Sequence, residues 1–309
     1  MTQSLRYTLL SLRDLLVSVG PFLLLAVLML GGAYWWLDPN PPKTVRLATG
    51  PAQSAYANFG QRYAKALAKD GISVQLVATQ GSADNLRLLR EGAVDLGFVR
   101  GGTADPAELE DANLESLGSL FLEPVWLFYR EAVAPADTTP PQTLDSLTQL
   151  QGLRVNVGTP GSGIPNLMGK LLESNRIAPT ALTLSQLEQT PATVALLAGE
   201  LDAIVFASAP ESNLVQMLLQ TPGIKLMDFA QNEAYSRRFS FVSPVVLPRG
   251  VVDLAANIPA RNVRLIAPTT TLLTRDGTHP ALLQLFALAG NTIHGGPGWF
   301  KHAREFPNI

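Results

Sequence analysis

From Val45 onwards, the sequence alternates short apolar runs with amphipathic stretches that end at a glycine. The first run, residues 45–49, has the length and composition of a buried strand. The stretch after it carries aromatic and leucine side chains at helical spacing between Tyr56 and Leu67, and stops at Gly71. Strands and helices that alternate in this way bury their apolar faces in an α/β lobe with a mainly parallel sheet.

The same order recurs later in the chain, where a strand at 154–157 leads into a Gly/Ser loop at 158–163 and a helix. Two segments can be superimposed on each other: Leu89-x-x-Gly92-x-x-Asp95 and Leu196-x-x-Gly199-x-x-Asp202. Such punctuation is common in βαβ units, but together with the recurring loops it predicts two similar lobes. We expect residues 123–130 to cross between them, and a return crossing within 245–275. Lobe 1 then comprises residues 43–126 and 268–309, and lobe 2 residues 127–267.

Before this globular part lies a stretch without charge, residues 15–37, which is long enough for a helix to cross a bilayer. Arg6 and Arg13 precede it, so we expect 1–14 to be cytoplasmic, 15–37 to be an anchor in the inner membrane, and 38–42 to be a linker. The alternative is a cleaved signal peptide with a small-residue site at 31–33. Both alternatives place the remainder of the chain in the periplasm.

Composition excludes several functional classes. The net charge is −2, from 23 basic and 25 acidic side chains, so no basic field exists to hold nucleic acid. The chain has no cysteine and three histidines, all near the C-terminus, which argues against metal ligands and catalytic triads. The loop 158–163 is followed by Ile164 and Pro165, which lack the cation and hydroxyl of a P-loop. We therefore predict no cofactor, no metal, no catalytic residue and no enzymatic activity.

Three loops are predicted at the carboxyl ends of strands, where open α/β sheets bind ligands: Thr49-Gly50, Gly81-Ser82 and 158–163. Glycine lets the backbone approach a ligand closely, and helix N-termini offer free N–H donors with partial positive charge. Several such loops at one cleft form a site for a carboxylate or phosphate. Ser82, Thr159 and Ser162 add hydroxyl donors.

Arg100 directly follows a predicted buried strand, so its guanidinium can pair with a ligand carboxylate, or else lie on the solvated surface. Tyr56 can stack on a ligand or pack against the first helix. Asp202 can orient a ligand ammonium or simply begin a strand. Ser54, which can cap the first helix, and Phe206, at the end of a buried strand, complete the predicted ligand-binding set.

These motifs, in this order, resemble the TAXI family of TRAP-transporter solute receptors over roughly residues 43–307. The shared motifs are Ala48-Thr49-Gly50, Gly81-Ser82-x-x-Asn85-Leu86, Gly92-x-x-Asp95-Leu96-Gly97-Phe98-Val99 and Val157-Gly158-x-Pro160-Gly161-Ser162-Gly163. The tail from Ile293 to Pro307 resembles a membrane-anchored branch of that family, whose members continue into further sequence, which would make this chain short at its C-terminus.

The resemblance implies a type II periplasmic-binding-protein fold with two crossover strands. It also implies an amino-acid or dicarboxylate ligand, such as glutamate or 2-oxoglutarate, that is delivered to the membrane subunits of a TRAP transporter. By position, the implied ligand shell comprises Gly50, Tyr56, Gly81, Ser82, Asn85, Gly161, Ser162 and Gly163.

The chain departs from the family pattern at two places. The loop 50–55 has less glycine and threonine than usual, and Arg100 stands where a glutamine is common. The arginine favours a more anionic ligand, and we expect it to select a dianion. Three alternatives remain open at this point: a substrate-binding protein of an ABC transporter, a membrane-anchored ligand sensor, and a hydrolase or transferase on an α/β scaffold.

Overall fold

The computed structural model describes residues 3–37, 42–52, 54–104, 106–134, 143–210 and 212–308. Most of the predicted linker, residues 38–41, lies outside them. Contacts within the chain define two units. One comprises Met1–Pro42 with His279–Ala281, and the other comprises Lys43–Thr278 with Leu282–Ile309. The second is the globular unit, which is described separately from the N-terminal helix.

The N-terminal unit is built on one helix, α1 (Gln3–Leu37). Its segment Val17–Trp36 has a mean hydropathy of 1.9, and the side chains of this segment are not buried. By length and composition the segment can cross a bilayer, although a signal sequence has the same properties. The predicted apolar helix is therefore confirmed, and the choice between anchor and signal peptide stays open.

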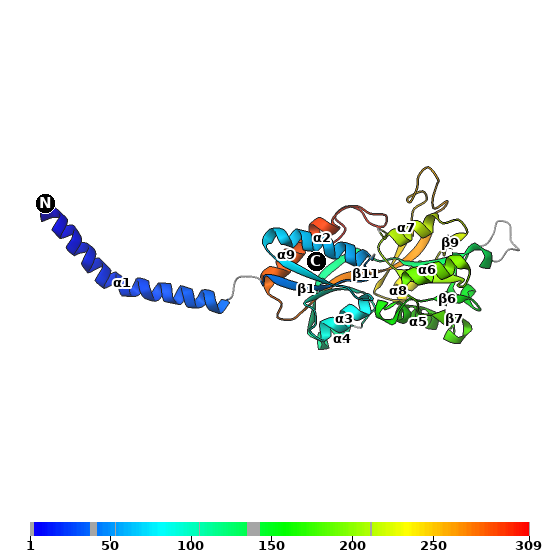
Figure 1. Ribbon diagram of the computed structural model, residues 1–309, viewed down its shortest axis with the longest axis horizontal. Helices are drawn as coiled ribbons and strands as arrows, with labels where there is room; N and C mark the ends of the chain where they lie inside the picture. Colours follow the sequence, from blue (N-terminus) through cyan, green and yellow to red (C-terminus); the bar gives the residue numbers. More distant parts are fainter. Residues whose placement is uncertain are drawn as a thin grey trace. The chain divides into compact units, whose positions relative to one another are not determined.

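Lobe 1 of the globular unit is a sheet with helices on both faces (Figure 1). Its strands run in the order β10-β11-β3-β1-β2, and β4 pairs with the other edge of β11. β1 is parallel to β2 and β3, whereas β11 is antiparallel to β3 and β4. The elements are β1 (Thr44–Ala48), α2 (Ala55–Leu67), β2 (Ser73–Val77), α3 (Ser82–Arg90), β3 (Leu96–Arg100), α4 (Pro106–Asp111), β4 (Leu114–Leu122) and α9 (Pro280–His294).

Lobe 2 has a sheet in the order β7-β6-β8-β5-β9. Its elements are β5 (Val125–Arg130), β6 (Arg154–Asn156), α5 (Ile164–Ser174), β7 (Thr183–Ser185), α6 (Gln189–Ala198), β8 (Ala203–Ala207), α7 (Asn213–Gln220), β9 (Ile224–Leu226) and α8 (Asn232–Arg238). After them come β10 (Val242–Leu247) and β11 (Val263–Arg275), which belong to the sheet of lobe 1. When the lobe 1 sheet is read as β2-β1-β3-β11-β4, its strands correspond one by one to β7-β6-β8-β5-β9 of lobe 2. In both lobes the fourth strand is antiparallel and arrives by a crossing, which confirms the two-lobed α/β fold.

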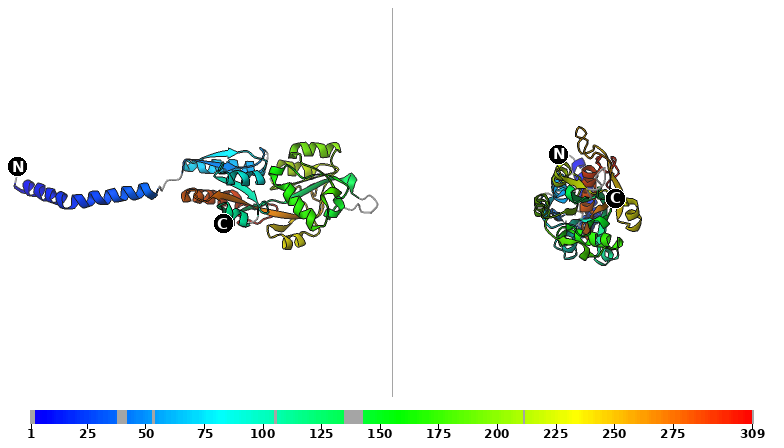
Figure 2. Two further views of the ribbon diagram at one scale, coloured as in Figure 1. Left: turned by 90° about the horizontal axis from the view of Figure 1, so that it is seen from below. Right: turned by 90° about the vertical axis from the view of Figure 1, so that its right-hand side faces the viewer.

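The two crossings lie side by side. The chain leaves lobe 1 between β4 and β5 and returns along β11, which pairs with β10 through residue 268 and with β4 from residue 269. The Glu123 amide donates a hydrogen bond of 2.8 Å to the Pro268 carbonyl. The left view of Figure 2 shows the C-terminal part, in orange and red, back in the lobe of the blue strands. The predicted boundary after residue 126 assigns Val125 and Trp126 to lobe 1, and both side chains are buried in the same core cluster as those of β6 and β8.

The repeated Gly-x-x-Asp segments perform the same structural task in each lobe. The Asp95 carboxylate accepts the amide of Arg46 in β1 at 2.7 Å, and the Asp202 carboxylate accepts the amide of Arg154 in β6 at 2.9 Å. Each arginine side chain also pairs with its aspartate and donates to the carbonyl of the segment's glycine, Gly92 or Gly199. The repeat therefore fastens β1 to β3 in lobe 1 and β6 to β8 in lobe 2.

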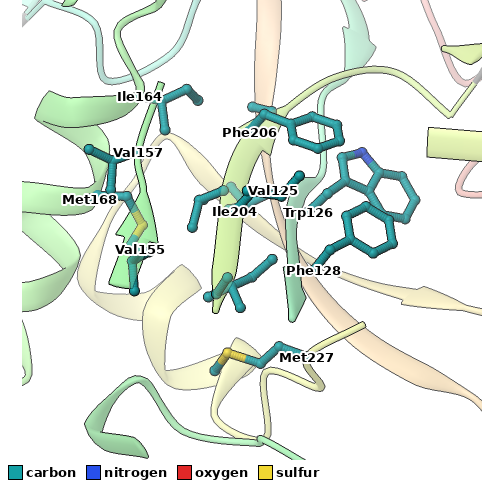
Figure 3. Packing of buried hydrophobic residues seen from close by; sticks show 14 of the residues in the cluster. Val125, Trp126, Phe128, Val155, Val157, Ile164, Met168, Ile204, Phe206 and Met227 are labelled. Atoms are coloured by element: carbon teal, nitrogen blue, oxygen red, sulfur yellow. The ribbon is translucent and has the colours of Figure 1, made fainter. Parts of the chain in front are cut away.

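The lobe 2 core packs on both faces of its sheet (Figure 3). On one face the ring of Phe128 lies 6.2 Å from that of Trp126 and 5.9 Å from that of Phe206, measured between centroids. Ile164 and Met168 pack on the other face, beside β6 (Figure 3). Because Phe206 is the penultimate residue of β8, this packing fixes the carboxyl end of that strand.

We expect Asp202→Asn to destabilise the fold by about 1–2 kcal/mol, because the amide loses the charge-assisted bonds to a half-exposed guanidinium. The Arg154 hydrogen bond is the largest of the effects that lower the pKa of Asp202. The stabilisation is therefore complete above the ordinary value of about 3.9 and is lost as the pH falls through the lower folded pKa. Urea unfolding of the micelle-solubilised chain at pH 7 and pH 3 measures this. Asp70→Asn, in an exposed turn, is the control. If Asp202→Asn lowers the free energy of unfolding equally at both pH values, the stabilisation does not come from the ion pair between Asp202 and Arg154.

Candidate functional site

A cavity of about 260 Å³ lies between loops of the two lobes, at the carboxyl ends of β6 and β8. We call it the interlobe pocket. It is lined by Pro51, Ala52, Ser54, Gln80, Gly158, Thr159, Ser162, Ile164, Leu187, Glu188, Gln189, Thr190, Phe206 and Leu214. Lobe 1 contributes the first four of these residues and lobe 2 the rest. The cavity thus occupies the place where sheets of this class bind ligands.

Four helices begin at the interlobe pocket. Ser54 is the N-cap of α2, Ile164 is the first residue of α5, Glu188 is the N-cap of α6, and Leu214 lies in the first turn of α7. The amides of a first helical turn have no partner within the helix and carry partial positive charge. Among the described residues that line this pocket, Glu188 alone has a formal charge, and its carboxylate accepts the Gln80 amide at 3.1 Å. Glu188 contributes a negative charge, so any partial positive charge at this pocket comes from the backbone amides.

Four predicted ligand-binding residues line the interlobe pocket: Ser54, Thr159, Ser162 and Phe206. Two of these use their hydroxyls locally. Ser54 accepts the Ala57 amide at 3.2 Å, and Ser162 donates to the Thr159 carbonyl at 2.6 Å while accepting the Ile164 amide at 3.2 Å. These bonds hold the oxygen atoms at fixed positions beside the cavity.

Three predicted glycines lie where the lobes touch. A Cβ atom at Gly81 would approach the Cα of Ser162 to 3.1 Å, and one at Gly161 would approach the Cβ of Gln80 to 2.6 Å. A Cβ at Gly163 would lie 3.0 Å from the Arg100 guanidinium. The contact therefore depends on glycine. At Gly50 an added Cβ would instead meet the Ser54 hydroxyl at 2.7 Å, so this glycine permits the turn into α2.

Arg100 lies in a buried polar network, which excludes the surface alternative. It is 4% exposed, and its guanidinium lies 3.7 Å from the carboxylate of Glu123, which is also 4% exposed. Glu123 further accepts hydrogen bonds of 2.8 Å from the hydroxyls of Tyr56 and Thr270. On its other side, Arg100 donates to the Ser162 carbonyl of lobe 2 at 3.0 Å. One guanidinium thus joins the crossing strands to the loop 158–163 of lobe 2.

Sequence reasoning missed Glu123, which was assigned only as the start of a crossing strand. The signal was present, since Glu123 is a single charge within the apolar run Leu120-Phe121-Leu122-Glu123-Pro124-Val125-Trp126. A charge that is buried in such a run needs a partner. Tyr56 is one partner: burial, followed by the Glu123 charge, raises the pKa of Tyr56 well above its ordinary value. The phenol therefore remains a hydrogen-bond donor.

The remaining predicted residues serve the fold. Asn85 donates to the Phe98 carbonyl at 2.8 Å and accepts the Thr79 hydroxyl at 2.7 Å, so both ends of its amide are used. Ser82 accepts the Arg100 amide at 2.7 Å. Asp202 precedes β8, at the end opposite Phe206, and pairs with Arg154. The structure does not bring Asp202 to the interlobe pocket.

Among the described residues, no group of three or more histidine, cysteine, aspartate or glutamate side chains is placed to hold a metal ion. The side chains at the interlobe pocket can donate hydrogen bonds, accept them and pack against an apolar body. This arrangement suits reversible binding of a small molecule.

The sequence profile of the NMT1-like family matches residues 47–280. Among solved structures, the alkanesulfonate-binding protein SsuA of Xanthomonas axonopodis pv. citri, bound to MOPS, has a TM-score of 0.53 at 15% identity, over 82% of this chain and 74% of that one. The sulphonate-binding SsuA of Escherichia coli gives 0.50 at 15% identity, over 82% and 73%. A Corynebacterium glutamicum OxyR mutant with bound H₂O₂ gives 0.51 at 14% identity, over 91% and 73%. The structural likeness establishes the fold, whereas sequence identities this low leave the ligand open.

We expect Gly161→Ala to separate the lobes, because its methyl group would overlap the Gln80 side chain at the loop contact. Overpacking of about 1–3 kcal/mol corresponds to roughly tenfold weaker ligand binding or more. Small-angle scattering should show a larger radius of gyration for this variant. Gly169→Ala in α5 is the matched control, since a Cβ there meets nothing within 4 Å. If both variants scatter like the wild type, the loop contact does not hold the lobes together.

Proposed function

The chain belongs to the NMT1-like family, and on that basis we propose that it is an extracytoplasmic solute receptor whose interlobe pocket binds a small anionic organic ligand. The ligand class we propose is an amino acid or dicarboxylate, such as glutamate or 2-oxoglutarate, for uptake by a TRAP-type transporter. The apolar helix α1 supports a tether to the inner membrane, with the globular unit in the periplasm.

The observation that carries this proposal is the convergence of four helix N-termini on a pocket without lysine or arginine in its described lining. Each N-terminus stabilises an anion by about 0.3–1 kcal/mol, and by more where water is excluded. Size supports the same class. A cavity of about 150 Å³ holds benzene, with six heavy atoms. On that scale 260 Å³ holds about ten, which is the size of glutamate or 2-oxoglutarate.

Arg100 carries a full positive charge beside this pocket, because its guanidinium donates to the carbonyl of Ser162, which lines the pocket. We propose that a second ligand carboxylate takes the place of that carbonyl on the guanidinium. The Glu123 carboxylate already offsets much of the positive charge of Arg100. The preference for a dianionic ligand should therefore be weaker than an arginine without such a partner would produce. The sequence-based expectation of an arginine free to select a dianion is corrected in this respect.

A second candidate function is a receptor of the ABC-transporter type for a sulfonate. It is favoured by the likeness to two SsuA proteins whose names specify sulfonates. A sulfonate is also an oxyanion that helix N-termini can hold. A tethered sensor is the third, and α1 supports it equally well, because a tether suits signalling as well as transport.

We expect calorimetric titration of the micelle-solubilised chain to show binding of glutamate or 2-oxoglutarate, weaker binding of an alkanesulfonate, and none of arginine. Thr159→Val removes a hydroxyl from the pocket lining while keeping its shape, and should weaken binding about tenfold. Thr183→Val, on β7 and outside the lining, is the matched control. Tightest binding of the sulfonate would favour the second candidate, and binding of arginine alone would refute an anion receptor.

We expect Arg100→Gln to destabilise the chain by about 3 kcal/mol, because it leaves the Glu123 carboxylate buried without its cation. Arg100→Gln with Glu123→Gln should recover much of this stability. In that double variant, 2-oxoglutarate should bind about ten- to a hundred-fold more weakly than to the wild type, whereas glutamine should bind nearly as before. Thermal unfolding and calorimetry with both ligands measure the two effects. Equal losses for the two ligands would limit Arg100 to a structural role.

A further inference from the structure

Glu188 carries the single formal charge among the described residues that line the interlobe pocket, and the function proposed above gives it no part. It is the N-cap of α6, yet within the described part of the chain its carboxylate makes no capping hydrogen bond to that helix. The carboxylate instead reaches across to lobe 1, where it accepts the Gln80 side-chain amide at 3.1 Å. Both side chains are exposed, so they lie at the mouth of the pocket.

The repeated segments of the two lobes provide an internal comparison for this position. Gly81, the N-cap of α3, lies eight residues before Leu89, and Glu188 lies eight residues before Leu196. The two N-caps are therefore equivalent positions. Since the lobe 1 helix begins at a glycine, the turn into such a helix does not require an acidic side chain. The carboxylate of Glu188 is thus free to act on the contents of the pocket.

The charge of Glu188 is not offset by a cation. Among the described residues, the neutral amide of Gln80 is the one partner of this carboxylate. The helix N-termini at the pocket, that of α6 included, carry partial positive charge. The pocket therefore presents one full negative charge beside a set of positively polarised amides. A ligand that complements both has an ammonium and a carboxylate on the same small body.

Provided that the interlobe pocket binds a small organic anion, as proposed above, we propose that Glu188 selects an α-amino acid over the corresponding oxo acid. An α-amino acid carries its ammonium and its carboxylate on the same carbon. The two groups can meet Glu188 and the first turn of α6 together, because Glu188 directly precedes that turn. An oxo acid presents a carbonyl oxygen in place of the ammonium, so it meets the Glu188 carboxylate with an acceptor and with one more net negative charge. Glu188 thereby takes the role that sequence reasoning gave to Asp202.

Calorimetric titration of the full chain in nanodiscs tests this with glutamate and 2-oxoglutarate, which differ only in the group on the second carbon. Glu188→Gln keeps the shape of the side chain and removes its charge. It should weaken glutamate binding about fivefold, as expected for an ion pair at an exposed site, and strengthen 2-oxoglutarate binding about twofold. Glu200→Gln makes the same charge change beyond the C-terminal end of α6 and outside the described lining, and should change neither affinity.

A further variant separates the charge of Glu188 from its bond between the lobes. Gln80→Met removes the hydrogen bond and keeps the charge, so an effect on lobe closure should change both affinities by the same factor. If the wild type binds both ligands and Glu188→Gln leaves the ratio of their Kd values unchanged, selection by Glu188 is refuted while the proposed function stands. Tighter binding of 2-oxoglutarate than of glutamate by the wild type would refute it too. If neither ligand binds the wild type saturably, the proposed function fails and the role of Glu188 fails with it.

Discussion

The arrangement of the two lobes depends on the buried ion pair between Arg100 and Glu123. Removing two charges from water is costly unless additional hydrogen bonds complete the pair. Here the hydroxyls of Tyr56 and Thr270 supply them, from α2 and β11. The carboxylate is therefore satisfied only when the first helix, the outgoing crossing and the returning strand are all in place. This requirement fixes the junction from which both lobes extend.

The same pair relates the junction to ligand choice. Arg100 donates to the Ser162 carbonyl, and Ser162 lines the interlobe pocket. A ligand group that reaches the guanidinium must compete with that carbonyl and approach a carboxylate 3.7 Å from the same cation. If the proposed function holds, discrimination between ligands with one and two negative charges depends on Glu123 as much as on Arg100. The backbone amides at the four helix ends would then hold an anion of either kind.

Much of the fold could be predicted, because the glycine stops, apolar periodicity and strand–helix alternation are local signals. They located β1, α2 and β3, and they identified the Gly-x-x-Asp repeat. Four predicted ligand residues line the interlobe pocket, since a loop after a parallel strand must lie at that edge of the sheet. Asp202 precedes its strand, so the same rule would have placed it at the opposite edge. Glu123 was missed because its partners are distant in the sequence: Arg100 lies 23 positions before it and Thr270 lies 147 positions after it. The periodicity of apolar residues does not indicate pairing over such separations.

The tail was also predicted only in part, because it was assigned wholly to lobe 1. Its Phe300 ring lies 6.0 Å from that of Trp126 in the lobe 2 core, whereas Asn308 pairs with Ser119 in lobe 1. The tail is thus a third connection beside the two crossing strands. Two adjacent strands permit both bending and twisting between the bodies that they join. A third attachment with a contact in each lobe adds to the two strands, so we infer that the tail limits how far the lobes can twist against each other.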